Sequence, residues 1–297
     1  MITSRRSPIV QQVRSLHDRR GREAARQFLA EGPGAVMAAL GASPQGLGVV
    51  EQVMVTSAFL ARQVTWSQRL AAAAASGVPV TEVSDDVMSV MSPTRQPAGL
   101  LALCRRTAEL DLSDFLKPRD NQAVLVCLDQ PNDPGNLGTI IRTADAAGCQ
   151  GVATLGHSTD PANDKAVRAS AGSVFHVPVL AVHQPSEFLH KARAAGWLVI
   201  ATAADGAQDG FRWLGERPLS GPVLWLFGNE AHGLNAQLAA LADVNLRIPM
   251  TGSTESLNLA AAVAVCLFAP ALLRVTVWGE SSPGSSTQRE SSVTSQR

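Results

Sequence analysis

The stretch VLVCLDQPNDPGNLGTIIRTADAAG, residues 124–148, joins a strand, a polar loop and a helix in one run. Residues 124–128 are continuously apolar, which is typical of a parallel strand buried on both faces. Prolines and glycines then predict a tight turn, and residues 137–147 have helical apolar spacing that stops at a glycine. Open α/β sheets bind ligands beyond the carboxyl ends of their strands, so Asn136 and Arg142 are candidate site residues. An ordinary strand–helix turn with a capping asparagine and a surface arginine is the competing interpretation.

Apolar runs and helical patterns continue to alternate towards the C-terminus. The apolar runs predict further strands at 151–155, 177–179, 197–202, 223–227 and 244–248. Helical spacing predicts helices at 161–171, 186–195, 236–242 and 256–273. This alternation indicates an α/β domain with a parallel sheet.

A smaller α/β unit precedes this series. Strands are expected at 50–56, 80–83 and 99–104, and helices at 58–75 and 86–91. The apolar positions of residues 10–29 also fit helical spacing. Residues 109–121 lack clear periodicity, so they are expected to link two domains, 1–108 and 122–276. The serine-rich end of the chain, residues 277–297, is expected to be a disordered tail.

Two further polar loops follow strand ends. In VLWLFGNEAHGL, residues 223–234, a glycine allows close approach by a ligand, and Glu230 can hold an arginine in bidentate fashion. In IPMTGSTESLNLAAAVAVCLF, residues 248–268, Ser256 and Asn258 stand at the mouth of an apolar helix. Helix capping would explain Ser256 but not Asn258. Three polar loops at parallel strand ends predict a pocket for a small ligand.

The composition excludes several classes of protein. The 297 residues include 25 basic and 25 acidic side chains, so the chain is not a uniformly basic nucleic-acid coat. No C-x-x-C pair, metal-ligand cluster or G-x-G-x-x-G loop is present, so neither a metal site nor a dinucleotide site is indicated. The four cysteines are expected to be buried free thiols in a reducing cytosol. The apolar run at 257–273 is interrupted by Pro270, which favours a buried helix over a membrane span.

Basic residues are concentrated at the start of the chain. Residues 1–28 contain seven arginines and two acidic residues, a local charge of +5 in a neutral chain. Arg19, Arg20 and Arg22 form the densest part of this group. They predict either a solvated helical face or a surface that neutralises RNA phosphates.

Taken together, the motifs resemble the SpoU (TrmH) family of RNA ribose 2′-O-methyltransferases, within the SPOUT superfamily. The patterns N-x-G-x-x-x-R, F-G-x-E-x-x-G-L and I-P-M-x-G-x-x-E-S-L-N occur in the family's order, and the resemblance covers residues 122–273. Residues 164–178 are similar to the family's sequence between the first two motifs. The start of the chain resembles the substrate-binding domain that these enzymes often carry, which in turn resembles ribosomal proteins that bind kinked RNA. The sequence at 32–34, Gly-Pro-Gly, departs from that domain, in which a helix usually follows directly.

The resemblance implies an α/β fold in which a trefoil-knotted SPOUT methyltransferase domain follows a small α/β RNA-binding domain. The knot would be formed by the chain from about residue 200 to residue 273, and family members are homodimers packed through it. S-adenosylmethionine is the implied cofactor, and no metal is required. Cofactor contacts are implied for Thr202, Gly228, Ile248 and Leu257.

The same resemblance implies roles for the polar residues of the motifs. Arg142 would stabilise the forming alkoxide or an adjacent phosphate, and Glu230 would orient Arg142. Arg168 would touch RNA or the cofactor. Ribose and phosphate would be positioned by Asn136, Ser256 and Asn258.

Several substrates remain compatible with the sequence. Ribosomal RNA of the 23S type is expected, because tRNA-specific relatives often lack the N-terminal domain. The alternatives are a tRNA 2′-O-methyltransferase, an RNA-binding ribosome-assembly protein without activity and a small-molecule methyltransferase. The sequence indicates neither the target nucleotide nor a housekeeping or antibiotic-resistance role. A cytoplasmic location without a membrane partner is expected.

Overall fold

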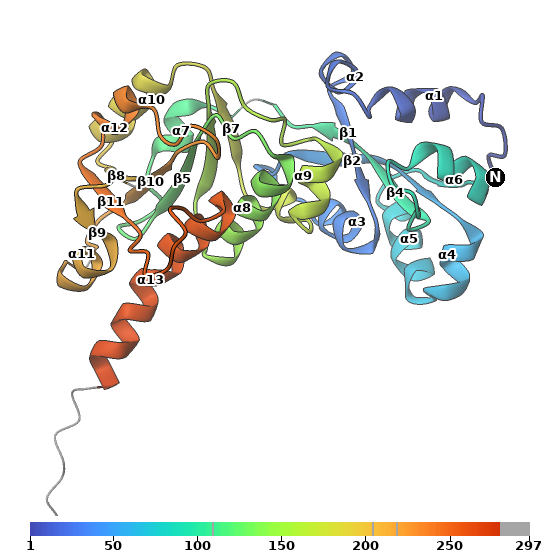
Figure 1. The fold of residues 1–297 in the computed structure, drawn as a ribbon. Coiled ribbons are helices and arrows are strands. Elements are labelled where there is room, and N and C mark those ends of the chain that lie inside the picture. The colour runs from blue at the N-terminus through green and yellow to red at the C-terminus, as the bar shows by residue number, and fades with distance from the viewer. Residues whose placement is uncertain (109, 204, 218, 280–297) are drawn as a thin grey trace, which may run out of the picture.

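The computed structural model describes residues 1–108, 110–203, 205–217 and 219–279. Two domains lie side by side, an N-terminal domain built on a four-stranded sheet and a C-terminal domain built on a seven-stranded sheet (Figure 1). The expected tail, 277–297, lies outside the described residues except for its first three, which continue the last helix. Among the described residues, no helix combines the length and the apolar character needed to cross a bilayer.

The sheet of the C-terminal domain confirms the expected parallel α/β architecture. Its strands are β5 Val124–Asp129, β6 Gly151–Leu155, β7 Val179–Val182, β8 Leu198–Thr202, β9 Gln208–Asp209, β10 Val223–Phe227 and β11 Val244–Arg247. They lie in the order β7-β6-β5-β10-β8-β11-β9, and every pairing is parallel. Because β10 lies between β5 and β8, the second motif ends in the middle of the sheet.

Alternate side chains of β5 point into two separate cores, as expected for a strand covered on both faces. Val126 and Leu128 belong to the first core, and Leu125 and Cys127 belong to the second. The first core is closed by α8 Pro134–Ala146, α9 Asp164–Ala169, the 3-10 helix η1 Ser173–Phe175, α11 Gly210–Glu216 and α13 Leu259–Gly279. The second core is closed by α7 Leu112–Leu116, α10 Pro185–Ala194 and α12 Ala236–Ala239.

The N-terminal domain is the smaller α/β unit that the sequence indicated. Its strands are β1 Gln27–Glu31, β2 Gly48–Val55, β3 Val80–Glu82 and β4 Leu100–Arg106. They lie in the order β1-β4-β2-β3, with β4 antiparallel to both neighbours and β3 parallel to β2. Its helices are α1 Pro8–Ser15, α2 Arg19–Ala25, α3 Pro33–Leu40, α4 Ser57–Arg62, α5 Thr65–Ala75 and α6 Asp85–Met91.

Two predictions for the N-terminal domain were wrong. The helical pattern expected up to residue 29 stops at Arg26, whose left-handed backbone (φ 53°) ends α2, and the following residues form β1. The helix expected over 58–75 is two helices, because Gln63 leaves the helical region with φ −127° and ψ 67°. The family resemblance implied a helix after β1 but left its start open at residues 32–34, and α3 begins at Pro33.

The expected linker is part of the C-terminal domain. Within residues 109–121 the chain forms α7, and Phe115 and Leu116 are buried in the second core. The last helix also differs from the prediction, since it begins at Leu259 and continues to Gly279. Neither α11 nor β9 was predicted from the sequence.

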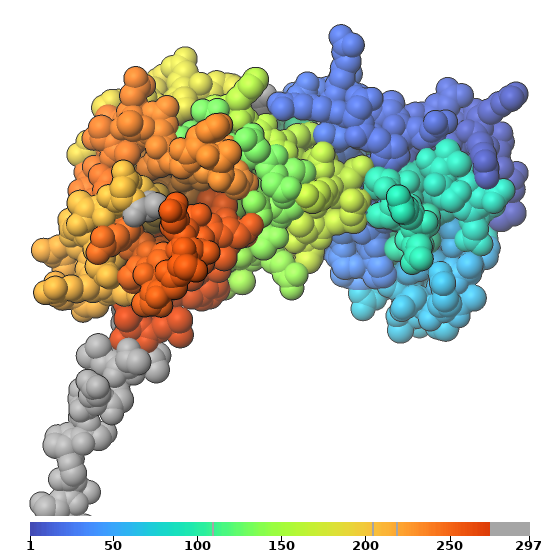
Figure 2. Space-filling model, in the orientation of Figure 1, coloured from blue at the N-terminus to red at the C-terminus, as the bar shows by residue number. Residues whose placement is uncertain are grey.

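The two domains share one continuous apolar core. Phe28 of β1 stacks on Phe175 of η1, with ring centroids 5.8 Å apart. The backbone N–H groups of Ser43 and Leu47 donate to the carbonyl oxygens of Phe175 and Val174, over 2.9 and 2.8 Å. Figure 2 shows the green and yellow-green surface of the C-terminal domain abutting the blue surface of the N-terminal domain.

Candidate active site

A pocket of about 780 Å³ lies at the carboxyl ends of β8, β10 and β11. This volume is in the ordinary range for small-molecule sites. Its lining includes eight of the residues proposed from the sequence: Asn136, Thr202, Gly228, Glu230, Ile248, Ser256, Leu257 and Asn258. The three motifs therefore meet at one site, as the parallel strands predicted.

Side-chain hydrogen bonds join the three motifs beside the pocket. Asn258 Nδ2 donates to Asn136 Oδ1, and Asn136 Nδ2 donates to Glu230 Oε1, each over 3.0 Å. The Glu230 carboxylate also accepts from the backbone N–H groups of Asn132 and Asp133, over 3.3 and 3.5 Å. The amide of Asn136 is therefore held on both sides.

Asn258 is the cap of α13. Its Oδ1 accepts from the backbone N–H groups of Ala260 and Ala261, over 2.9 and 3.4 Å. The helix therefore starts three residues later than predicted, and Ser256 and Leu257 remain in the exposed loop that lines the pocket. A single asparagine thus caps the helix with its oxygen and contacts the first motif with its nitrogen.

The turn after β10 needs glycine for its own closure. A Cβ on Gly228 would lie 2.2 Å from the backbone nitrogen of Leu234 and 2.3 Å from the carbonyl carbon of Gly233. Asn229, which the sequence analysis missed, exchanges backbone hydrogen bonds of 2.8 and 2.9 Å with Gly233. Its side chain donates to the carbonyl oxygen of Gln130 and so ties the second motif to the first. Its position within the second motif was the only sequence feature that could have identified Asn229 as a site residue.

Arg142 lies away from this pocket. It is exposed on α8, and its guanidinium forms no hydrogen bond or ion pair with any residue that the structure describes. Six positions separate it from Asn136, which places it about 9 Å further along the helix and about 240° around the axis. Within this chain, Glu230 accepts a hydrogen bond from Asn136 and forms no hydrogen bond or ion pair with Arg142, so the orientation of Arg142 by Glu230 stays a prediction. Arg168, on α9, is likewise exposed and outside the pocket lining.

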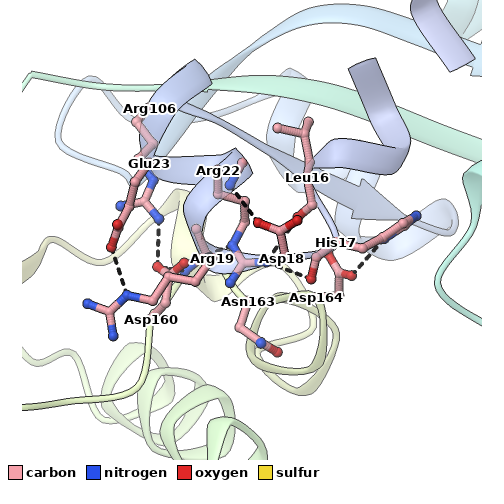
Figure 3. Close-up of polar contacts among 12 residues, drawn as sticks. Leu16, His17, Asp18, Arg19, Arg22, Glu23, Arg106, Asp160, Asn163 and Asp164 are labelled. Atoms are coloured by element: carbon pink, nitrogen blue, oxygen red, sulfur yellow. Dashed lines mark hydrogen bonds and ion pairs between the residues drawn. The ribbon is translucent and has the colours of Figure 1, made fainter. Parts of the chain in front are cut away.

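The three N-terminal arginines have different environments. Arg20 is exposed, and Arg19 is exposed with its Nε 2.7 Å from Glu23 Oε1. Arg22 is only 2% exposed, and its Nε donates to Asp160 Oδ2 over 2.8 Å (Figure 3). The prediction of an RNA contact is therefore corrected for Arg22, because its guanidinium is enclosed between the domains.

The pocket is acidic. Its lining includes the carboxylates of Asp205, Glu230 and Glu255, and none of the described lining residues is a lysine or an arginine. No three His, Cys, Asp or Glu side chains are grouped as metal ligands in the part of the chain that the structure describes. This wall favours a ligand with positive charge.

Family models match both domains. The SpoU rRNA Methylase family matches residues 123–268, and the MRM3-like substrate binding domain matches residues 7–102. The 23S rRNA (guanosine(2553)-2′-O)-methyltransferase RlmP of Bacillus subtilis is 33% identical over 267 residues, which cover 90% of this chain and 97% of that protein. The chain belongs to the SpoU rRNA methylase family. All eight pocket-lining residues predicted from the sequence lie within the SpoU match.

Solved structures extend the similarity to both domains of this SpoU family member. The AdoMet-bound rRNA methyltransferase from Sinorhizobium meliloti is 36% identical with a TM-score of 0.78, and the match covers 91% of this chain and 96% of that chain. The SpoU methyltransferase AviRb from Streptomyces viridochromogenes, in complex with AdoMet, is 29% identical with a TM-score of 0.76, covering 91% and 100%.

Proposed function

We propose that this protein transfers a methyl group from S-adenosylmethionine to a ribose 2′-hydroxyl of 23S ribosomal RNA. The observation that carries the proposal is the hydrogen-bonded chain Asn258–Asn136–Glu230, which joins the three SpoU motifs beside one pocket. The names of the relatives point to the same reaction and the same class of substrate.

The charge of the pocket fits the cofactor. S-adenosylmethionine is a net cation, because its sulfonium and ammonium groups outweigh its carboxylate. The acidic wall formed by Asp205, Glu230 and Glu255 complements that charge. When bound, the cofactor supplies an electrophilic methyl group, so the transfer requires no metal. Its contacts are assigned to Thr202, Gly228, Ile248 and Leu257, which line the pocket.

The hydrogen-bonded side chains of Asn258, Asn136 and Glu230 orient the groups that bind the acceptor ribose. Because Glu230 and Asn258 hold the Asn136 amide, its orientation is set before RNA arrives. Asn136, Asn258 and the neighbouring Ser256 are assigned to the positioning of ribose and phosphate. Positioning of this kind contributes up to about 7–11 kcal/mol when the reacting atoms are aligned. Glu230 acts as the orienting residue for Asn136.

The reaction also needs a positive group, because negative charge develops on the ribose oxygen. The described pocket lining offers no lysine or arginine, and Arg142 is exposed without an ionic partner among the described residues. Arg142 is therefore assigned to the pocket of a second copy in a homodimer. Exposed apolar side chains at Leu257 and Phe268, before and within the helix that packs along α8, support such an association.

The SPOUT trefoil knot is assigned to the chain between about residue 200 and residue 273. The insertion of β10 between β5 and β8, together with the packing of α13 on α8, supports this assignment. Residues 1–108 are assigned to RNA docking, with Arg19 and Arg20 on α2 and Arg168 on α9 as exposed phosphate contacts. A cytoplasmic location is part of the proposal, and a ribosomal substrate supports it.

Transfer of radiolabel from S-adenosylmethionine to purified 23S rRNA tests the proposal. The expected result is one nucleotide with a labelled 2′-O-methyl group, mapped by the resistance of its phosphodiester bond to alkaline cleavage. Labelling of tRNA alone would favour the tRNA alternative. Tight RNA binding with no transfer would favour a ribosome-assembly protein, and the proposal would then be wrong.

A further inference from the structure

Asp160 forms ion pairs with two arginines of the N-terminal domain, one on α2 and one on β4 (Figure 3). Arg22 Nε lies 2.8 Å from Asp160 Oδ2, and Arg106 Nη2 lies 2.6 Å from Asp160 Oδ1. Arg22 and Asp160 are 2% and 7% exposed. These three residues, here called the interdomain latch, join α2 and β4 to the loop that precedes α9.

Arg22 and Asp160 also have partners outside the latch. Arg22 Nη1 donates to the carbonyl oxygens of Leu16 and His17, over 2.9 and 3.1 Å. Asp160 Oδ1 also accepts from the backbone N–H of Ala162, over 3.0 Å. A buried charge held by several partners is costly to leave unpaired, so it favours one arrangement of the groups around it. The latch therefore favours one orientation of the two domains.

The same loop has two further contacts with the N-terminal domain. His17 Nδ1 lies 3.2 Å from Asp164 Oδ2, and Arg19 Nη1 donates to the carbonyl oxygen of Ser158 over 3.3 Å. Residues 158–164 are therefore bonded to the turn between α1 and α2 as well as to α2 itself.

Helix α9 connects this loop to the pocket. Lys165 Nζ lies 2.7 Å from Asp133 Oδ2, and Asp133 Oδ1 accepts from the backbone N–H of Asn136 over 2.8 Å. The hydrogen bond from Lys165 lowers the pKa of Asp133, which keeps this carboxylate ionised. The helices α8 and α9 touch through their backbones, since a Cβ on Gly138 would lie 2.2 Å from the carbonyl oxygen of Ala166. A shift of α9 is therefore transmitted to Asn136.

We propose that the interdomain latch positions the RNA by holding the N-terminal domain in a fixed orientation, so that the target ribose reaches Asn136. This inference rests on the proposed function. Arg22, Arg106 and Asp160 lie outside the pocket lining and act through α9, so they are positioning residues. RNA still binds to a molecule with a loosened latch, but it presents the ribose in many positions. The loss falls on kcat with RNA, and KM for RNA and cofactor affinity stay near the parent values.

Arg106→Gln is the sharpest variant, because Arg106 is 24% exposed and its loss leaves the Arg22–Asp160 pair to maintain the fold. We expect kcat to fall about tenfold to a hundredfold, because small misplacements of reacting groups lower the rate by amounts of this order. Arg106→Lys keeps the charge and recovers most of the rate. The matched control is Arg105→Gln on the same strand, whose Nε pairs with Glu51 inside the N-terminal domain over 3.0 Å. The control retains the parent kcat.

A distance measurement separates positioning from a general loss of structure. Spin labels at Ser89→Cys and Ser186→Cys, both exposed, report one distance between the domains in the full chain. In Arg106→Gln the distance distribution broadens, while the stoichiometry of S-adenosylmethionine binding stays that of the parent. An unchanged kcat, a rise in KM alone, or a lower kcat with an unchanged distance distribution overturns the inference. A parent protein that methylates no RNA refutes the proposed function instead, and the distance measurement still decides whether the latch fixes the domains.

Discussion

At the scale of single residues, Asn136 links the site, because the side chains of Glu230 and Asn258 both form hydrogen bonds with it. Asn136→Ala removes both side-chain hydrogen bonds and leaves Glu230 and Asn258 without this partner. We expect methyl transfer at saturating RNA to slow by about 10²–10³, the usual loss of a prearranged polar contact. Single-turnover transfer and calorimetry of cofactor binding check this, and the cofactor affinity stays near that of the parent.

Thr139→Ala is the matched control for Asn136→Ala. Thr139 lies on the same helix, is exposed, and uses its hydroxyl only for the carbonyl oxygen of Gly135, over 2.8 Å. We expect the parent rate. Equal losses of rate in the two variants would mean that any substitution on α8 disturbs the helix, and the role assigned to Asn136 would be contradicted.

Arg142 allows a test of action between subunits. Arg142→Ala alone is expected to slow transfer by about 10²–10³ with its fold intact, because the side chain is exposed. A mixture of Arg142→Ala and Asn136→Ala chains restores activity, since each mixed dimer has one pocket with intact Asn136 and a partner with intact Arg142. Transfer assays on mixed dimers purified with two affinity tags check this. Inactive mixed dimers would place Arg142 and Asn136 in the same subunit's site.

Eight of the residues that line the pocket were predicted from the sequence, but the hydrogen bonds among them were not. Asn136, Glu230 and Asn258 follow strand ends, and parallel strands bring those ends to one edge of the sheet. The direction of Arg142 depends on how α8 is rotated against the sheet, which packing decides. For that reason the hydrogen bond between Asn136 and Glu230 was not predicted from the sequence. Asn258 was recognised as unusual, but its double role needed the position of Asn136.

At the scale of elements, α2 carries two exposed arginines, which we propose contact RNA, and one arginine of the latch. Replacing Arg19 and Arg20 by Gln is expected to weaken RNA binding and flatten its salt dependence, with Arg22 left intact. About 0.7–0.9 counterions are released per neutralised phosphate, so the log–log slope should fall by roughly 1.4–1.8. RNA affinity measured at several salt concentrations checks this.

Arg212→Gln with Arg217→Gln is the control for that experiment. Arg212 pairs with Glu216 over 2.8 Å on one helix, in the same four-residue spacing as Arg19 with Glu23. These side chains lie in the other domain, on α11 and just after it, and we expect the parent slope. Equal flattening by both pairs would mean that RNA senses overall charge rather than the surface of α2.

Elements were predicted well where local signals agree with the final packing. The central strands of the C-terminal sheet, such as β5 and β10, are apolar runs and were predicted, whereas β9 consists of Gln208 and Asp209 and was not. The spacing of Phe28 and Leu29 suits a helix as well as a strand, and the pairing of β1 with β4 decides between them. That partner lies more than 70 residues away, as the register of Phe28 with Cys104 shows, and local spacing carries no information about it.

At the scale of the whole molecule, the four cysteines are free and buried, as predicted. Burial raises the pKa of Cys149 and of Cys266 to about 12, so both are thiols at neutral pH. We expect Ellman's reagent to leave the native protein unmodified and to label all four cysteines in denaturant. Rapid labelling of any cysteine in the native protein would contradict the packing described here.

The latch also predicts a response to acid. Burial alone would raise the pKa of Asp160, but the charge of Arg106 and the hydrogen bond from Arg22 lower it overall. A lowered folded-state pKa stabilises the fold above about pH 3.9, and that stability is lost as pH falls towards the folded value. The melting temperature of the parent should therefore drop more steeply below about pH 4 than that of Arg106→Gln. Parallel curves for the two proteins would exclude Asp160 as the source.

The shared core has a consequence for synthesis on the ribosome. Chain growth completes the N-terminal sheet at Arg106, but Phe28 and Arg22 then lack Phe175 and Asp160, their partners in the C-terminal domain. At about 5–20 residues per second, the missing segment emerges roughly 3–14 seconds later. During that interval the nascent chain displays an apolar face beside an unpaired guanidinium. Ribosome-associated chaperones that bind exposed apolar surface should bind the growing chain in that window and leave once η1 has docked.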